Sequence, residues 1–331
     1  MRVITGASGH IGGVLARVLA DQGDPRQVRA IFREGKGTAA DLDIEWIGGD
    51  ILDQESLVTA FSGAETVFHL AALVSIDPGR AKEIHTTNVS GTRNVVEAAL
   101  RCGVRRLVHV SSIHAFNQYP LDEVLDESRG PADGPRNAAY DRSKAAGEKE
   151  IRRGIDRGLD AVILNPTSVI GPFDGVPSYM GHVFLDLHRR RIPAQVAGGF
   201  DWVDVRDVVA ATVAAETKAR CGENYLLAGG WDSVRNLALL SEQATGVPVS
   251  RFVVPLFVAR LWAPFQVMLD RSQGRRPLYT PAAVRVMSNS NRRISNAKAR
   301  SELGFEPRPL ADSVRDTYRW FDEQGMLGET G

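Results

Sequence analysis

The stretch Thr5-Gly6-Ala7-Ser8-Gly9-His10-Ile11-Gly12 decides the fold. It follows a short apolar segment, residues 2–5, and precedes a pattern that predicts a helix over 11–22. In such a strand–turn–helix setting, glycines spaced GxxGxxG allow a tight turn, a close backbone approach to a pyrophosphate, and close packing of the helix on the strand. The helix N-terminus would offer free N–H groups to the phosphates. An ordinary βα turn is the alternative.

Strand and helix patterns alternate outward from this turn. Helices are predicted over 11–22, 82–101, 137–157 and 205–219. Strands are predicted over 2–5, 27–32, 44–47, 66–70, 106–110, 161–164 and 223–227. Such alternation implies parallel βαβ units. The sequence therefore predicts an α/β fold, a Rossmann-type doubly wound parallel sheet with a smaller substrate-binding lobe.

We expect two parts in the chain. Residues 1–170 would form the dinucleotide-binding part, and segments near 200–227 would return to it. Residues 171–331, which glycines and prolines interrupt early on, would mainly form the substrate-binding lobe.

Composition excludes several classes of protein. The 331 residues include 40 Lys+Arg and 40 Asp+Glu, so the formal net charge is zero, and we expect no nucleic-acid partner. Cys102 and Cys221 cannot build a disulfide framework, and neither the cysteines nor the seven histidines show metal-ligand spacing. We predict no metal, no signal peptide and a reducing, cytoplasmic location.

The longest apolar stretch, residues 252–269, is interrupted by Arg260 and contains Pro255 and Pro264. A membrane span needs about 20 apolar residues, so we expect no transmembrane segment. We interpret the stretch as a helical cap or lid, with contact to a membrane surface as the alternative.

The residues after the second strand indicate which dinucleotide would bind. A carboxylate there usually holds a ribose 2′-hydroxyl, whereas a guanidinium suits a 2′-phosphate. Arg33 stands at the strand end, with Glu34 next and Lys36 close behind. We favour NADP(H), with NAD(H) as the alternative. Asp50, after the third strand, is a candidate acceptor for the adenine amino group.

Three residues form a candidate catalytic set. Tyr140 and Lys144, at i and i+4, would share one helix face. A nearby ammonium lowers the pKa of a tyrosine, and Lys144 could also hold the nicotinamide ribose. Ser112 follows the strand 106–110 at its carboxyl end, at the sheet edge where ligands bind, and its hydroxyl could polarise a carbonyl.

With these motifs the chain resembles an extended short-chain dehydrogenase/reductase of the NAD(P)-dependent epimerase/dehydratase superfamily. Within it, the chain is most similar to the dihydroflavonol-4-reductase-like and 3β-hydroxysteroid-dehydrogenase-like branch. The residues that carry the resemblance lie at 5–12, 28–33, 49–53, 69–72, 88–92, 110–112, 140–144 and 165–172, with weaker matches at 202–208 and 298–305.

The resemblance implies roles. Tyr140 would be the general acid–base, Lys144 its partner, and Ser112 the residue that orients the carbonyl. Asn88 matches a structural asparagine. The expected cofactor contacts are Gly6, Ser8, Gly9, His10, Ile11, Gly12, Arg33, Lys36, Asp50, Ile51, Leu70, Ala71, Ala72, Tyr140, Lys144, Pro166, Thr167, Ser168 and Val169.

The substrate site is less well determined. Asn165 stands where the family usually has an arginine before the proline. The candidate substrate residues are Ser75, His114, Asn165, Phe173, Tyr179 and Trp202. Core packing is the alternative for the three aromatic residues, and His114 could also simply pack.

The leading hypothesis is an NADP(H)-dependent oxidoreductase that reduces a ketone or aldehyde to an alcohol, or the reverse, on a moderately apolar small molecule. The alternatives are a 3β-hydroxysteroid-type dehydrogenase and an NAD-dependent nucleotide-sugar epimerase or dehydratase. The latter would need basic residues for a diphosphate, for which Arg189 to Arg191, Arg206 and Arg251 are candidates. A cofactor-sensing binding protein is a minor alternative. A homodimer through helices 82–101 and 137–157 is possible.

Overall fold

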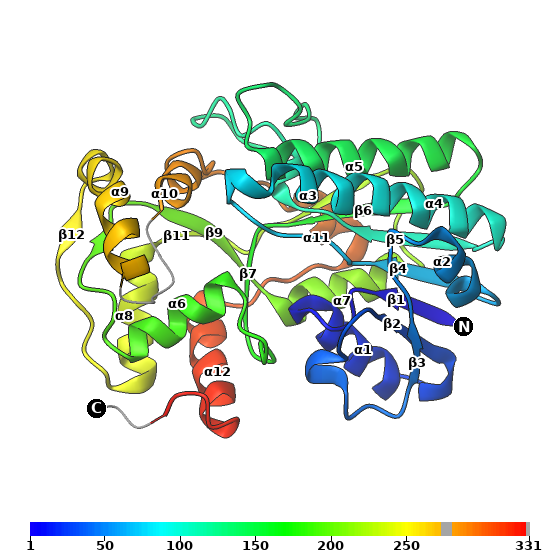
Figure 1. Cartoon of the computed structure of the whole chain (residues 1–331), viewed down its shortest axis with the longest axis horizontal. Helices are drawn as coiled ribbons and strands as arrows, with labels where there is room; N and C mark the ends of the chain where they lie inside the picture. The colour runs from blue at the N-terminus through cyan, green and yellow to red at the C-terminus, as the bar shows by residue number, and fades with distance from the viewer. Residues whose placement is uncertain (273–279, 329–331) are drawn as a thin grey trace.

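The computed structural model describes residues 1–272 and 280–328 (Figure 1). A seven-stranded sheet forms the larger part of the molecule. Its strands are β1 (Arg2–Thr5), β2 (Val28–Phe32), β3 (Glu45–Gly48), β4 (Thr66–His69), β5 (Arg106–Val110), β6 (Ala161–Pro166) and β10 (Asn224–Leu227). They pair in parallel in the order β10-β6-β5-β4-β1-β2-β3. This doubly wound order confirms the predicted fold class.

Helices cover both faces of this sheet, because successive residues of each strand point to opposite faces. Ile4 and Val108 pack in one apolar cluster, and Val3 and Leu107 in the other. The first cluster includes residues of α1 (His10–Asp21), α7 (Val205–Ala215) and α11 (Ala297–Leu303). The second includes residues of α2 (Gln54–Phe61), α4 (Gly91–Arg101) and α5 (Ala139–Asp156).

The strand order reverses beside β1, which pairs with β2 on one side and with β4 on the other. Open α/β sheets bind ligands at such a reversal, beyond the carboxyl ends of the strands. The glycine-rich turn after β1 therefore lies where a ligand is expected.

The predicted helix over 82–101 is three segments in the structure. An α-helical turn, α3 (Ala81–His85), is followed by a π-helical turn over Thr86–Ser90 and then by α4. A π-helical turn of this kind is rare and often occurs at functional sites.

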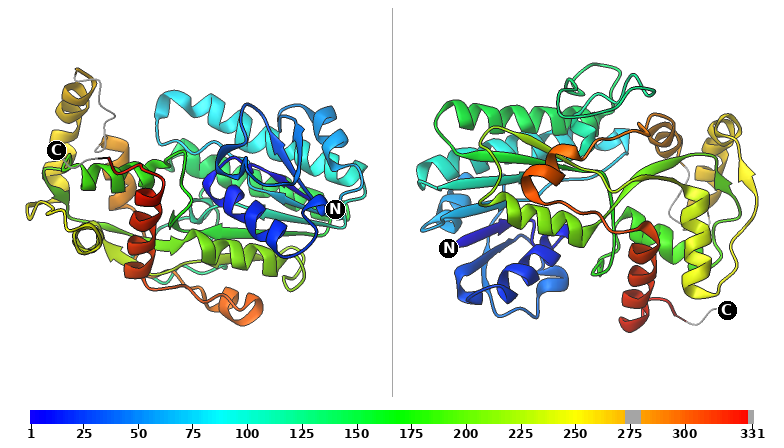
Figure 2. Two further views of the ribbon diagram at one scale, coloured as in Figure 1. Left: turned by 90° about the horizontal axis from the view of Figure 1, so that it is seen from below. Right: turned by 180° about the vertical axis from the view of Figure 1, so that it is seen from behind.

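A smaller lobe follows β6, and the irregular segment expected there is largely helix and strand. Its sheets contain β7 (Ser168–Ile170), β9 (Gly199–Asp204) and β11 (Trp231–Ser233), and β8 (Gln195–Val196) with β12 (Val253–Val254). Its helices are α6 (Tyr179–His188), α8 (Val234–Thr245), α9 (Leu256–Ser272), α10 (Pro281–Ser288) and α12 (Leu310–Glu323). Figure 2 shows this lobe at one end of the molecule. No helix within the described residues is long and apolar enough to cross a bilayer.

Arg106, at the start of β5, links the sheet to the C-terminus of α7 through hydrogen bonds. It is 7% exposed, and its Nη2 donates to both carboxylate oxygens of Asp160 at 2.8 Å. Its Nη1 donates to the carbonyls of Ala215 and Ala219 at 3.0 and 2.9 Å. A cation at a helix C-terminus satisfies carbonyls that have no helical partner. This contact accounts for the end of α7 at Ala215, four residues before the predicted end.

We predict that Arg106→Ala lowers the free energy of unfolding by about 3 kcal/mol, because it leaves a carboxylate and several carbonyls without their donor. Arg105→Ala is the matched control. Arg105 is exposed and pairs only at the surface with Glu65, so its loss is expected to cost less than about 1 kcal/mol. Denaturant unfolding of both variants measures the difference, and equal losses would contradict the role given to Arg106.

Candidate active site

The turn after β1 is closed by glycines that leave no room for a side chain. Gly6 has φ +78°, and a Cβ built on it would lie 2.6 Å from the nitrogen of Ala71. A Cβ on Gly12 would lie 2.1 Å from the Gly6 carbonyl oxygen. The first and third glycines therefore have the steric roles that the motif predicts.

The N-terminus of α1 fits a phosphate group. Gly9 is the N-cap, and no side chain caps the helix. A Cβ on Gly9 would meet only the Gly6 carbonyl, at 3.4 Å, so the backbone is open on its outer side. Uncapped N–H groups on an accessible helix end suit the pyrophosphate of a dinucleotide. His10 closes one flank, since its Nε2 lies 2.8 Å from the carbonyl oxygen of Pro172, beyond β7.

The loop after β2 packs against this turn. A Cβ on Gly37 would lie 2.4 Å from the carbonyl oxygen of Ser8. Arg33 is exposed, with Glu34 3.5 Å away, and Lys36 lies over the rings of Phe32 and Trp46. Arg33 and Lys36, the cations expected to bind the 2′-phosphate, therefore lie on a loop that borders the glycine turn.

The loop after β4 forms another border of the turn. The Leu70 nitrogen donates to the Thr5 carbonyl at 3.1 Å, and the Ala71 nitrogen donates to the Thr5 hydroxyl at 3.3 Å. Ala72 follows on the exposed side. Farther along, Ser75 accepts a hydrogen bond from the nitrogen of Asp77.

Asn88, inside the π-helical turn, holds this loop in place. Its Oδ1 accepts from the Leu73 nitrogen at 2.7 Å, and its Nδ2 donates to the Leu73 carbonyl and to the Ser143 hydroxyl at 3.0 Å each. The π-helical turn thereby joins the loop after β4 to α5. This supports the structural role that the resemblance implies.

Asp50 and Ile51 lie after β3. Oδ1 of Asp50 accepts a hydrogen bond from the Leu52 nitrogen at 2.9 Å, so that oxygen shapes its own turn. Ile51 is 8% exposed and packs against Gly91 of α4. Asp50 remains partly exposed, whereas the side chain of Ile51 contributes to the core.

Ser112, Tyr140 and Lys144 come together at the carboxyl end of β5. All three are buried, and Ser112 lies close enough to Tyr140 to lower the pKa of its hydroxyl. The Nζ of Lys144 lies 3.5 Å from the Val110 carbonyl oxygen. The structure therefore brings the predicted catalytic set into one place.

The electrostatics of the set differ from the expectation. Burial raises the pKa of Tyr140 to about 12. The side chain of Ser112 lowers this pKa in part, and the charge of Asp141 raises it further. Lys144 is not among the groups that shift this pKa, so the expected lowering by its ammonium is not found. Burial also lowers the pKa of Lys144 to about 8, and Glu148 partly opposes this shift.

Two buried histidines lie near Lys144, and no local sequence pattern singled them out. His69 and His109 stack with ring centroids 4.9 Å apart. Burial, with the charge of Lys144, lowers the pKa of His69 to about 3 and that of His109 well below its usual value. Both rings are neutral at physiological pH, so neither places a competing cation near Lys144.

Asn165 corrects a prediction. It was expected to line the substrate pocket, yet it is 0% exposed and its amide bonds only to protein groups. Its Nδ2 donates to the Ser112 carbonyl at 3.0 Å and to Glu148 at 2.6 Å, and its Oδ1 accepts from Asn224 at 2.8 Å. Asn224 also donates to Glu148 at 3.0 Å. Asn165 therefore holds the backbone of Ser112 in position through a buried hydrogen bond.

The sequence held one usable signal for this network. Glu148 lies four residues after Lys144, on the helix face that already carries Tyr140. No comparable signal pointed to Asn224, because only the pairing of β10 with β6 brings it to Asn165.

His114 lies beside the catalytic set. Its Nδ1 is 2.9 Å from Oδ1 of Asp141, and its ring meets the Tyr140 ring edge-on with centroids 5.6 Å apart. Its side chain is 31% exposed. His114 is thus placed at the accessible side of Tyr140, where a substrate could contact it.

The segment after β6 also borders the set. The hydroxyl of Thr167 donates to Asp201 at 2.7 Å, which fixes the strand end, while Ser168 and Val169 are half-buried in β7. Pro166 ends β6 beside Leu227.

The three aromatic candidates differ in exposure. Trp202 is 4% exposed, and its Nε1 donates to the Asp232 carbonyl, an arrangement that fits the core packing given above as the alternative for this residue. Phe173 has φ +71° and packs on Trp320, and Tyr179 is half-buried at the start of α6. These two remain candidates.

A family model described as the NAD dependent epimerase/dehydratase family matches residues 2–228. The chain belongs to this family. It is 35% identical over 329 residues to sterol demethylase protein B of Methylococcus capsulatus, with 98% of this chain and 99% of the relative covered. It is 31% identical over 330 residues to a putative dihydroflavonol 4-reductase of Synechocystis, with 98% and 95% covered.

Solved structures give the same picture. The crystal structure of gox2253 superposes with a TM-score of 0.84, at 31% identity and with 99% of both chains covered. The enzyme WbmH of Bordetella bronchiseptica in complex with NAD⁺ has a TM-score of 0.75 at 24% identity, covering 98% of this chain and 99% of that one, a likeness of fold. As a member of the epimerase/dehydratase family, the protein is an NAD(P)-dependent oxidoreductase that acts on a small molecule.

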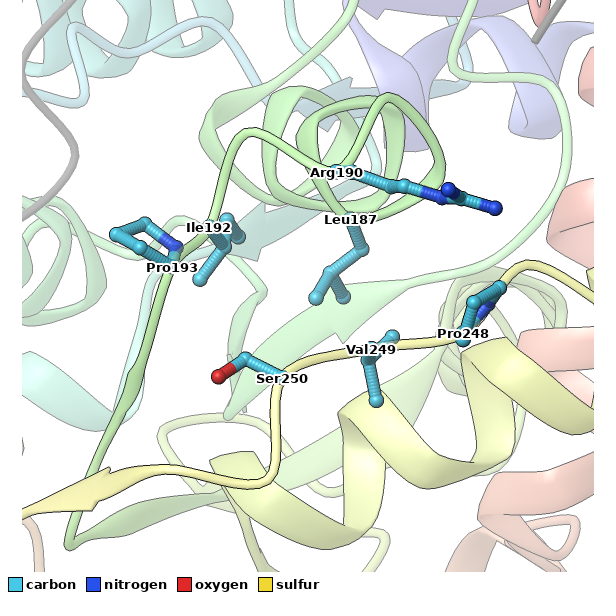
Figure 3. Close-up of a pocket in the computed structure, with 7 residues that line it drawn as sticks. All are labelled: Leu187, Arg190, Ile192, Pro193, Pro248, Val249 and Ser250. Carbon is cyan, nitrogen blue, oxygen red and sulfur yellow. The ribbon is translucent and has the colours of Figure 1, made fainter.

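A hollow in the smaller lobe of this family member lies apart from the catalytic set (Figure 3). It opens between the end of α6 and the segment that precedes β12. None of the predicted catalytic or cofactor-binding residues lines it, but Arg190, one of the arginines considered for a diphosphate, does. Its lining residues are Leu187, Arg190, Ile192, Pro193, Pro248, Val249 and Ser250.

Proposed function

We propose that the protein is an NADP(H)-dependent oxidoreductase that interconverts a ketone or aldehyde and the corresponding alcohol on a moderately apolar small molecule. The observation that carries this proposal is that the buried side chains of Ser112, Tyr140 and Lys144 come together at the carboxyl end of β5. Two hydroxyls that meet at the carboxyl edge of the sheet can both address one substrate oxygen.

In the proposed reduction, the carbonyl carbon accepts the hydride that NADPH, held at the glycine turn after β1, would supply. The Ser112 hydroxyl donates a hydrogen bond to the carbonyl oxygen, and the Tyr140 hydroxyl donates its proton to the same oxygen. The high pKa of Tyr140 keeps its hydroxyl protonated at neutral pH, which suits a proton donor. The Lys144 ammonium would hold the nicotinamide ribose, and the Ser112 side chain would stabilise the phenolate that remains.

The two parts of the chain would divide the work. Residues 1–170, with the segments near 200–227, would hold the cofactor, and residues 171–331 would mainly shape the substrate site. Ser75, His114, Phe173 and Tyr179 are the proposed substrate contacts. The relatives named as a sterol demethylase protein and a dihydroflavonol reductase support an apolar ring compound as substrate.

Three of the five arginines considered for a nucleotide-sugar diphosphate bind carboxylates of the protein in this structure. Arg206 binds Asp204 and Asp316, Arg251 binds Glu242, and Arg191 lies 3.6 Å from Asp186. A diphosphate would have to displace these carboxylates. This favours the reductase over the epimerase.

We predict that Tyr140→Phe lowers kcat for carbonyl reduction by a factor of about 10² to 10⁴, because the proton donor is lost. Purified protein is assayed with NADPH against ketones, aldehydes, hydroxysteroids and dihydroflavonols. The variant should retain its thermal stabilisation by NADPH. Tyr119→Phe, which alters an exposed hydroxyl bound to Asn289, is the control and should be fully active. Full activity of Tyr140→Phe would contradict the assignment.

We predict that Arg33→Ala weakens NADPH binding about tenfold or more and leaves NADH binding unchanged, because a charge-assisted hydrogen bond to the 2′-phosphate is lost. Thermal-shift titrations with both cofactors measure the effect. Arg26→Ala, an exposed cation just before the same strand, is the control. A wild-type preference for NADH would overturn the choice of NADP(H).

We predict that kcat/KM for reduction declines as pH rises past about 8, where Lys144 loses its proton. The charge of Glu148 raises the pKa of Lys144, so Glu148→Gln should move this decline to lower pH. Glu150→Gln is the control, since Glu150 pairs with Arg93 and Arg153 and is not among the groups that shift the pKa of Lys144. An unchanged pH profile in Glu148→Gln would exclude this role for Glu148.

A further inference from the structure

Helix α9 turns its largest apolar side chains outward. Phe257, Leu261, Trp262 and Phe265 are 69%, 73%, 62% and 61% exposed. Positions 257, 261 and 265 recur every four residues and therefore lie along one side of the helix. The rings of Trp262 and Phe265 lie 5.8 Å apart between centroids. These four residues are named the α9 apolar face.

The inner side of α9 consists of small residues. Ala259 and Ala263 are 7% and 1% exposed, and they pack in a cluster with Val284 and Met287 of α10. Alanines thus hold the helix to the lobe, so the bulky side chains do not serve this packing. Scattered exposed apolar residues are normal, but a contiguous group of large ones marks an interaction site.

The charge around α9 is strongly one-sided. Residues 252–293, the segment that contains α9 and α10, contain seven arginines against a single acidic residue, Asp270, a formal charge of +6 in a chain whose total is zero. Arg260 lies on α9 itself, and Arg285 lies on α10, and both are exposed. An anionic surface would complement this region.

The position of α9 suits contact with an extended surface. Figures 1 and 2 show α9 at the far end of the smaller lobe, remote from α1, α2 and α4. Phe252, just before the helix, is 77% exposed and enlarges the apolar surface. The helix has 17 residues with an arginine among them, which favours lying along a bilayer over spanning it.

We propose that the α9 apolar face docks on an anionic lipid bilayer. The four side chains would enter the acyl boundary while the surrounding arginines contact the headgroups. A second copy of the chain fits less well, because pairing this face with itself would bring two strongly positive regions together. The proposal is independent of the reaction proposed above.

Vesicle flotation of the full chain tests the proposal. We expect binding to vesicles of phosphatidylcholine and phosphatidylglycerol in equal parts, and about tenfold weaker binding to phosphatidylcholine alone, since the electrostatic attraction is lost. Leu261→Glu, and separately Phe257→Glu, should each reduce binding to the anionic vesicles about tenfold or more. Val176→Glu alters an equally exposed valine outside the α9 apolar face and should bind like the wild type.

Stabilisation by NADPH or NADH in a thermal shift shows that each variant is folded. Arg260→Glu, which keeps the apolar face intact, should weaken binding to anionic vesicles only. Equal binding to neutral vesicles would overturn the role of charge, and no binding to either vesicle would overturn the proposal. Light scattering measures the oligomeric state of the wild type and of Leu261→Glu. A wild-type dimer that Leu261→Glu converts to a monomer, without vesicle binding, would assign the face to a second copy and overturn the proposal.

Discussion

The close approach between helix α1 and the turn before it sets the geometry of the whole site. The carbonyl of Gly6 lies where a side chain of Gly12 would be, so the helix can rest on the turn only because that side chain is missing. With α1 in this position its N-terminus faces the edge of the sheet, where the strand order reverses. The loops after β2 and β4 pack on the same turn, and His10 reaches from it to Pro172 beyond β7. One turn thereby positions three loops that border the cofactor site.

A layer of buried polar groups supports the catalytic residues from below. Polar groups are costly to bury unless they are hydrogen-bonded. Hydrogen bonds join the side chains of Asn165, Glu148 and Asn224 to one another. Asn165 also donates to the backbone carbonyl of Ser112 and so holds it in place. The neutral histidines on β4 and β5 lie near Lys144 without adding charge. Low dielectric surroundings also make the pKa values of Tyr140 and Lys144 depend on burial more than on each other.

The two lobes differ in the kind of surface they present. The larger part contains a sheet covered on both faces, and many of its exposed charges are paired, as with Arg101 and Glu55. The smaller lobe has an excess of positive charge and an outward apolar helix face. A reductase for an apolar compound would find such a substrate concentrated in membranes, which links the proposed chemistry to the proposed docking surface.

The sequence by itself determined the α/β class, the place of the glycine turn and the identity of Ser112, Tyr140 and Lys144 as a set. These are local features, since strand–turn–helix patterns and i, i+4 spacing are readable along the chain. Only the tertiary structure decided the smaller lobe, the burial of Asn165 and Trp202, and the joining of Asn224 to Glu148. These depend on contacts between segments about 60 to 80 residues apart, which no local pattern encodes. The exposure of the α9 apolar face was also decided by the tertiary structure. The periodicity of apolar residues is the same for a buried and for an exposed helix face, so the neighbouring elements must be known.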